Sequence, residues 1–193
     1  WGEGNITDDP LFCDIDSDDF TLAENSPAIG MGALDVGCGP IDVGDIYEGP
    51  WYISPDGSDD TGDGSIDNPF STINQGMNTA LTGDTIWVGP GTYNESIFYN
   101  SKILAIMSTD GPVSTILQSD YRNVYINECN GGEPILKGFT ITGESDNEGW
   151  AEGVDTYTCT PILEDLVIYN KGVGVNLNSS ATLINLTLTN NTY

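Results

Sequence analysis

Three segments near the C-terminus share one alternation of apolar and polar positions. They cover residues 134–143, 161–170 and 181–190, and their starts lie 27 and then 20 residues apart. Their aligned apolar columns are Leu136, Leu163 and Leu183, then Phe139, Leu166 and Leu186, then Ile141, Ile168 and Leu188. Because side chains two residues apart on a strand point to the same face, we predict that each segment is a strand with one buried face. The intervening positions, such as Thr140 and Thr142, are mostly polar and are expected to face outward.

The short period of these repeats determines the fold class that we expect. A repeat of 20–27 residues holds strands and turns but no repeated helix. We therefore predict an all-β parallel solenoid whose like residues stack in ladders about 4.8 Å apart. Lys137 and Glu164 share a column and are expected to pair across neighbouring coils. A β-sandwich of short strands is the alternative, but its strands would not realign at nearly constant offsets.

A different pattern precedes the repeats, in residues 51–96. It indicates a strand, an acidic loop, a short helix and a second strand. Ile73, Met77 and Ala80 are spaced as on one face of a helix. Ser71 is the expected N-cap of that helix. Since the end of a solenoid exposes strand edges and core, we expect this amphipathic helix to cover it as a cap.

Residues 52–95 resemble the N-terminal head of secreted right-handed parallel β-helix proteins, the pectate-lyase-like superfamily. The pieces that carry the resemblance read, in chain order, YISPDGSD, GDGS, NPFSTI and GDTIWVGPGTYNE. The resemblance implies a right-handed parallel β-helix with a short N-terminal capping helix, its head in residues 51–96 and its coils in 97–193. It does not by itself imply lyase activity, because one fold serves many functions.

The first 48 residues are rich in Gly and Asp, and residues 4–40 resemble the C-terminal tail of the same kind of protein. The matching pieces are GNITDDPLF and DFTLAENSPAIG. In the family this tail follows the last coils and closes the solenoid, whereas here it comes first. We therefore divide the chain into an irregular, tail-like closing segment with its linker, residues 1–48, and a β-helix, residues 49–193.

This inverted order suggests how copies of the chain assemble. If the tail of one copy closes the coils of the next, the contact is head-to-tail and produces a filament or array of one repeated chain. The side chains that we assign to this contact are Trp1, Ile6, Leu11, Phe12, Leu186, Leu188 and Tyr193. Two alternatives stay open: the units are joined in one long tandem protein, or the sequence is a fragment whose order has no such meaning.

The charge of the chain excludes several functions. Four basic and 30 acidic side chains give a formal net charge of −26, and there is no histidine. So few cations cannot neutralise a phosphate backbone, and an anionic membrane would repel the chain. We therefore expect neither nucleic-acid binding nor membrane insertion. The lack of histidine excludes Ser-His and Cys-His catalysis and histidine metal sites.

The composition favours an extracellular or cell-surface protein. Lysine is scarce, and there is no apolar run of about 20 residues of the kind that spans a membrane. Triplets of the N-x-S/T type begin at Asn5, Asn94, Asn178, Asn185 and Asn190. These triplets are weak indicators by themselves, because a chain rich in Asn and Thr forms them by chance.

Two acidic loops are candidate calcium sites. In the first, the expected ligands are Asp56, Ser58, Asp60, Asp63 and Asp67, which follow the alternation of a calcium loop but place Thr61 where the turn glycine belongs. The second offers Asp14, Asp16 and Asp18, again without the glycine turn. Bound Ca²⁺ would offset the repulsion among these carboxylates, and a solvated acidic turn is the alternative.

The four cysteines are interpreted as two pairs. Cys13 and Cys38 lie in the closing segment, where a disulfide would stabilise a part of the chain with little core. Cys129 and Cys159 occupy comparable places in successive coils and form either a disulfide or stacked core thiols. Four cysteines allow three pairings, and the sequence does not choose among them.

No catalytic residue is assigned. The family resemblance implies that a lyase needs a Lys or Arg base and usually Ca²⁺ to neutralise a polyanionic substrate. The chain offers four scattered cations for this role, namely Lys102, Arg122, Lys137 and Lys171. Hydrolases of this fold use clustered carboxylates, but a pair such as Asp155 and Asp165 is expected by chance among 30 acids.

We therefore predict an extracellular structural protein, stabilised by calcium, that forms a head-to-tail homopolymer and is not an enzyme. The alternative is a polysaccharide lyase-like or glycan-binding β-helix domain with an extracellular polysaccharide as partner. Tyr125, Tyr157 and Tyr169 would stack on sugars in that case, although strand faces favour aromatic residues anyway.

Overall fold

The computed structural model describes residues 49–143 and 151–192, and in the N-terminal part residues 12–14, 19–23, 26 and 36–38. The chain divides into two compact units, Trp1–Ile46 and Tyr47–Tyr193. In the first unit the described strands are β1 (Phe12–Asp14), β2 (Asp19–Ala23) and β3 (Val36–Cys38). They form a sheet in the order β1-β2-β3, with β1 antiparallel and β3 parallel to β2.

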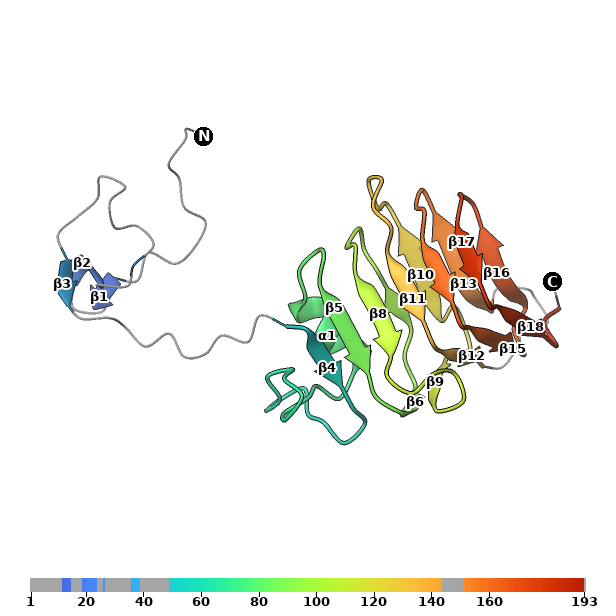
Figure 1. Cartoon of the computed structure of the whole chain (residues 1–193), viewed down its shortest axis with the longest axis horizontal. Coiled ribbons are helices and arrows are strands. Elements are labelled where there is room, and N and C mark those ends of the chain that lie inside the picture. Colours follow the sequence, from blue (N-terminus) through green and yellow to red (C-terminus); the bar gives the residue numbers. More distant parts are fainter. Residues whose placement is uncertain are drawn as a thin grey trace. The chain divides into compact units, whose positions relative to one another are not determined.

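The second unit is a parallel β-helix, which confirms the predicted all-β solenoid (Figure 1). Its six-stranded sheet contains β4 (Trp51–Ile53), β5 (Thr85–Val88), β8 (Ala105–Ser108), β11 (Ile135–Lys137), β14 (Ile162–Glu164) and β17 (Thr182–Ile184). The five-stranded sheet contains β6 (Gly91–Tyr93), β9 (Thr115–Gln118), β12 (Thr140–Thr142), β15 (Val167–Tyr169) and β18 (Thr187–Thr189). The four-stranded sheet contains β7 (Ile97–Phe98), β10 (Val124–Asn127), β13 (Glu152–Tyr157) and β16 (Val173–Leu177).

The chain visits the three sheets in a fixed order, so each coil contributes one strand to each sheet. The coils are β5-β6-β7, β8-β9-β10, β11-β12-β13 and β14-β15-β16, and β17 and β18 begin a further one. Within each sheet, the strands of successive coils pair in parallel. Side chains at equivalent positions therefore stack along the axis of the solenoid.

The predicted register of the repeats is confirmed, but each repeat holds two strands rather than one. Leu136 pairs with Leu163 and Leu163 with Leu183, as the apolar columns predict. The chain bends between the two strands at Gly138, Asp165 and Asn185, whose φ angles are 83°, 53° and 53°. This left-handed conformation turns the chain from the six-stranded sheet into the five-stranded one, and Gly, Asp and Asn adopt it most readily.

The prediction that the polar column faces the solvent is wrong at two positions. Thr140 and Thr142 are buried, with 8% and 9% of their surface exposed. The Thr140 hydroxyl donates to the carbonyl oxygen of Pro112 at 2.6 Å. The loop between β8 and β9 therefore covers this part of the outer face, and a hydroxyl group fits there because a buried carbonyl accepts from it.

The capping helix is α1 (Ile73–Thr79), and its predicted buried face is confirmed. Ile73, Met77 and Ala80 are all buried. The N-cap is Thr72 rather than the expected Ser71, because the Thr72 hydroxyl accepts from the backbone N–H of Gln75 at 3.1 Å. In the described part of the chain, no helix has the length and hydrophobicity needed to cross a membrane.

The core is a stack of apolar ladders that runs through the coils. Ile86, Ile106, Leu136 and Leu163 form one ladder of the six-stranded sheet, and none of them is exposed. The next position along this ladder is Leu183, which is 48% exposed because no further strand of the described chain lies against it. The burial of each rung thus depends on the coil that follows it.

Candidate functional site

A row of side chains crosses the outer face of the four-stranded sheet. Phe98, Tyr125, Asp155 and Asn176 are register partners on β7, β10, β13 and β16. Their neighbours Val124 and Val154 point into the core and are fully buried, so the alternation along the strands places this row on the opposite face. Four successive coils thus each contribute one residue to this row.

An ion-pair network joins this row. Arg122 contacts Glu152 through Nε and Oε2 at 2.6 Å, and Asp155 through Nη2 and Oδ2 at 3.2 Å. The amide of Asn176 donates to Glu152 Oε1 at 3.1 Å. The Arg122 guanidinium lies 4.6 Å from the centre of the Tyr125 ring, within cation–π distance. One guanidinium therefore ties β10 to β13, and Glu152 extends the link to β16.

Asp155 is the electrostatically perturbed member of this network. It is 6% exposed, and its Oδ1 atom has no hydrogen-bond partner among the described residues. Burial raises the pKa of Asp155, the charge of Glu152 raises it further, and Arg122 opposes the rise. The network therefore holds two carboxyl groups close to one cation, and Asp155 is the buried one.

The remaining three cations also make structural contacts. The ammonium group of Lys102 donates to the carbonyl oxygens of Met77 and Ala80 at 2.6 and 2.8 Å, and so caps the C-terminal end of α1. Lys171 is fully buried and donates to the carbonyl of Ser119 at 2.7 Å. These contacts could not be found from local sequence patterns, because they join residues that are more than 20 positions apart.

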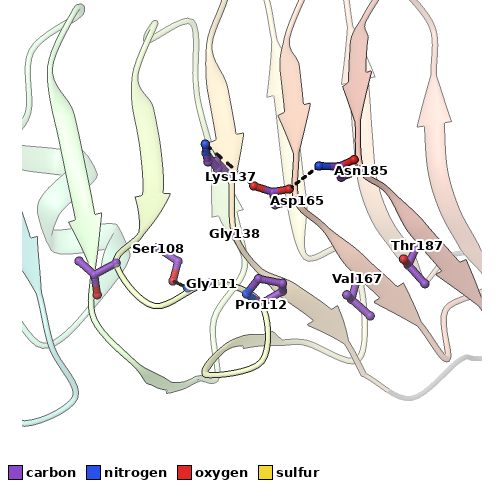
Figure 2. Close-up of a pocket in the computed structure, with 10 residues that line it drawn as sticks. Ser108, Gly111, Pro112, Lys137, Gly138, Asp165, Val167, Asn185 and Thr187 are labelled. Carbon is purple, nitrogen blue, oxygen red and sulfur yellow. Dashed lines mark hydrogen bonds and ion pairs between the residues drawn. The ribbon is translucent and has the colours of Figure 1, made fainter.

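Lys137 pairs with Glu164 at 2.9 Å, as the column alignment predicts. Lys137 also borders a groove along the corner between the six-stranded and five-stranded sheets (Figure 2). Asp165 lies at the same corner, where it accepts from the amide of Asn185 at 3.0 Å. Asp155 lies on a different sheet, so the structure does not bring Asp155 and Asp165 together as a carboxylate pair.

The first acidic loop is organised by its own hydrogen bonds. The Ser58 hydroxyl accepts from the backbone N–H groups of Asp60 and Thr61 at 3.3 and 3.2 Å. Asp63 accepts from the N–H of Ser65 at 2.9 Å. Asp56 and Asp67, the outer members of the predicted ligand set, are exposed. Among the described residues, no three Asp, Glu or Cys side chains gather as metal ligands would, and calcium binding stays a prediction.

Asp59 in this loop has a role that the sequence analysis missed. Its carboxylate accepts from the backbone N–H of Ser71 and from the N–H and hydroxyl of Thr72, at 2.8, 3.0 and 2.7 Å. Partial burial acts to raise its pKa, but these hydrogen bonds outweigh burial, and the pKa is lowered. The loop thus stabilises the start of α1. For the second loop, Asp14 ends β1, whereas Asp16 and Asp18 lie outside the described residues.

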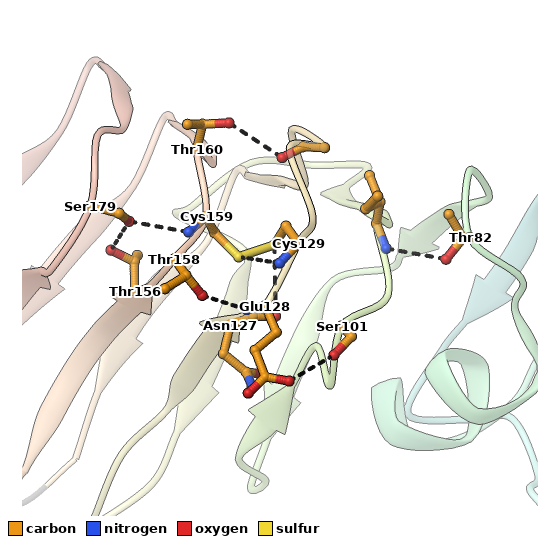
Figure 3. Close-up of a disulfide and its surroundings, with 12 residues drawn as sticks. Thr82, Ser101, Asn127, Glu128, Cys129, Thr156, Thr158, Cys159, Thr160 and Ser179 are labelled. Carbon is orange, nitrogen blue, oxygen red and sulfur yellow. Dashed lines mark hydrogen bonds between the residues drawn. A yellow bond between two sulfur atoms is a disulfide. The ribbon is translucent and has the colours of Figure 1, made fainter.

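A disulfide joins Cys129 and Cys159 across successive coils (Figure 3), which decides between the two alternatives left open for this pair. Its Cα atoms are 5.0 Å apart, and both residues are buried. The backbone N–H of Cys159 also donates to the Ser179 hydroxyl of the next coil at 3.4 Å. Cys13 and Cys38 belong to β1 and β3, and their side chains lie outside the described part of the chain.

The residues predicted for assembly and sugar stacking are only partly described. Leu188 is 53% exposed and Leu186 is partly buried. Trp1, Ile6, Leu11 and Tyr193 lie outside the described residues, and Phe12 is described only as part of β1. Of the three tyrosines, Tyr157 is 52% exposed, whereas Tyr125 and Tyr169 are half-buried.

Comparison with protein-family models found no match, and no curated protein matches the chain. A search of solved structures returned a chain titled "Rhamnogalacturonan lyase". It is 18% identical in sequence, with a TM-score of 0.49, and the match covers 65% of this chain and 37% of that chain. The strand order and register described above place this chain among the parallel β-helices, the fold that the resemblance of its head implies.

Proposed function

We propose that this protein is an extracellular structural module that assembles head-to-tail into a filament or surface array. The observation that carries the proposal is the exposed rung formed by β16, β17 and β18. Leu183 and Leu188 on this rung are 48% and 53% exposed, whereas the equivalent Leu163 and Ile168 of the preceding coil are buried. Residues 1–48 of the next copy would cover this rung and bury it.

The contacts of the four cations support a structural role over catalysis. A base for proton abstraction from a uronate needs an amino or guanidinium group that is free to reach the substrate. Lys102 and Lys171 donate to backbone carbonyls, and Arg122 and Lys137 are paired with carboxylates. We therefore expect no unsaturated product when the protein is incubated with pectate or rhamnogalacturonan.

Electron microscopy and sedimentation of the full chain test the assembly. We expect filaments, and we expect Leu188→Asp to abolish them because it places a charge in the covered rung. Val113→Asp is the matched control, since Val113 is 92% exposed in the loop between β8 and β9. Dispersed monomers at all concentrations, or filaments that Leu188→Asp leaves unchanged, would contradict the proposal.

Calcium is proposed to stabilise the first acidic loop, next to the capping helix. A ligand that binds only the folded state stabilises the folded protein, and above the dissociation constant this stabilisation grows with the logarithm of the free ligand concentration. We expect calorimetry to give a higher melting temperature with Ca²⁺ than with a chelator, and Asp60→Asn to reduce the difference. Equal melting temperatures in the two conditions would exclude this role.

Glycan binding on the outer face of the four-stranded sheet is the second candidate. Tyr157 favours it, because its half-exposed ring lies on the same strand as Asp155 and opposite Asn127 in the register. An aromatic ring beside polar side chains suits a sugar. A glycan array should then show binding by the wild type that is lost in Tyr157→Ala. Tyr121 is similarly exposed, so Tyr121→Ala is the matched control and should still bind.

A further inference from the structure

The outer face of the six-stranded sheet carries mostly apolar and aromatic side chains. Its two outward rows consist of Thr85, Ala105, Ile135, Ile162 and Thr182, and of Tyr52, Trp87, Met107, Lys137, Glu164 and Ile184. The residues between these rows, such as Ile106 and Leu136, point into the core and are fully buried. We call these two rows the neutral face.

The neutral face has no net charge, although the whole chain carries −26. The two charged side chains in its rows, Lys137 and Glu164, pair with each other at 2.9 Å, and Asp165 at the adjoining corner lies 3.9 Å from Lys137. Trp87, Met107 and Ile135 are half-buried by their neighbours on the sheet. The strands of this sheet run side by side along the solenoid (Figure 1), so register pairing joins the apolar positions Trp87 to Met107 and Ala105 to Ile135 and Ile162 in one strip over four strands. Contiguous apolar strips of this kind mark interaction surfaces.

We propose that a second copy of this chain packs on the neutral face, sheet against sheet, about a two-fold axis. Two copies with a net charge of −26 repel each other strongly when acidic surfaces meet. The neutral face adds little to this repulsion, because its own rows carry no net charge. A two-fold contact places the same face on both copies, so neutrality on one side is matched by neutrality on the other. Sheets packed in this way lie about 10 Å apart.

The size of the face determines how strong this contact is. Six strands, each about three residues long on this face, cover an area about 30 Å by 10 Å. That is well below the area of about 800 Å² per partner that a stable pair of proteins buries. A single pair of chains is therefore held weakly, and contacts that repeat along two parallel filaments add up. This step rests on the proposed head-to-tail assembly and makes the neutral face its lateral contact.

Sedimentation of the full chain over a range of concentrations tests the pairing. We expect weak dimers that become stronger as salt screens the like charges. Ile135→Lys should weaken pairing at least tenfold, because it places an ammonium group at the centre of the strip. Val113→Lys makes the same change of charge on an exposed loop and should pair like the wild type. Ile135→Thr retains a β-branched strand residue and should also weaken pairing. It tests the same contact if the lysine variant fails to fold.

Three outcomes would overturn the proposal: monomers at every concentration and salt, equal weakening by the two lysine variants, or pairing that neither Ile135 variant affects. Leu188→Asp distinguishes the end contact from the lateral contact. This variant should stop filament growth, but it should still form the dimer that is held together by the neutral face. In microscopy, Ile135→Lys should give single filaments where the wild type gives paired ones. A protein that forms dimers but no filaments would refute the end contact alone.

Discussion

Removal of the disulfide between Cys129 and Cys159 gives the most quantitative test of how the coils are held together. The bond links residues 30 positions apart, one coil to the next. In the chain-entropy description, closing a loop of this length stabilises the folded protein by about 3 to 4 kcal/mol, because it removes conformations from the unfolded chain. The double substitution Cys129→Ala and Cys159→Ala should therefore lower the free energy of unfolding by about that amount.

Urea unfolding of the wild type and of the double variant, each with and without a reductant, measures this loss. The reduced wild type should unfold near the reduced double variant, because the reductant opens the predicted disulfide between Cys13 and Cys38 equally in both proteins. Because solenoid coils can unfold separately, hydrogen exchange of β10 and β13 should show the same loss locally. A loss below about 1 kcal/mol in both measurements would refute loop closure as the main contribution of this bond.

The other predictions concern single side chains. Phe139→Ala should cost about 3 to 5 kcal/mol of unfolding free energy, since Phe139 is fully buried between two sheets. Asp59→Ala should cost about 1 kcal/mol in thermal or urea unfolding, because the N–H groups of Ser71 and of the N-cap residue Thr72, just before α1, lose their acceptor. This cost should vanish at a pH below the lowered pKa of Asp59. Burial raises the pKa of Asp155, so its contribution to stability falls as the pH rises from about 4 through the folded pKa. Asp155→Asn should remove that decline when the unfolding free energies of the two proteins are compared across this range.

The register of the coils was predictable from the sequence because it depends on a period of two. Leu136, Leu163 and Leu183 align at nearly constant offsets, and parallel pairing of successive coils places them in one ladder. The cross-coil pair of Lys137 and Glu164 follows from the same alignment. Once one apolar column is assigned, the facing of its neighbours on the same strand is fixed.

The corners and covered faces were not predictable in the same way. Gly138, Asp165 and Asn185 occupy one column, and each adopts a left-handed conformation that breaks the repeat into two strands. All three residue types tolerate that conformation, which is the signal that could have located the bend. Thr140 is different, because its burial depends on the Pro112 loop, and nothing local to Thr140 shows that this loop folds back over it.

The ion-pair network on the four-stranded sheet was missed because it depends on coil length. Arg122 and Glu152 are 30 positions apart and meet only because one coil returns the chain to the next strand of the same sheet. The repeated apolar columns lie on the strands of the other two sheets, and the strands of the four-stranded sheet share no such repeat in the aligned segments. With Tyr125 placed opposite Asp155, the contact of Arg122 with both carboxylates would have been expected.

The distribution of charge limits which surfaces of two copies can touch. Of the four cations, Arg122 and Lys137 pair with carboxylates, while Lys102 and Lys171 donate to backbone carbonyls. Most of the 30 acids therefore have no cation beside them, and the folded chain remains strongly negative. Repulsion between such surfaces grows as they approach, so association requires a face without net charge or a bound cation. The neutral face satisfies the first condition and a calcium-loaded acidic loop would satisfy the second, so salt should strengthen contact through the face and a chelator should weaken contact through the loop.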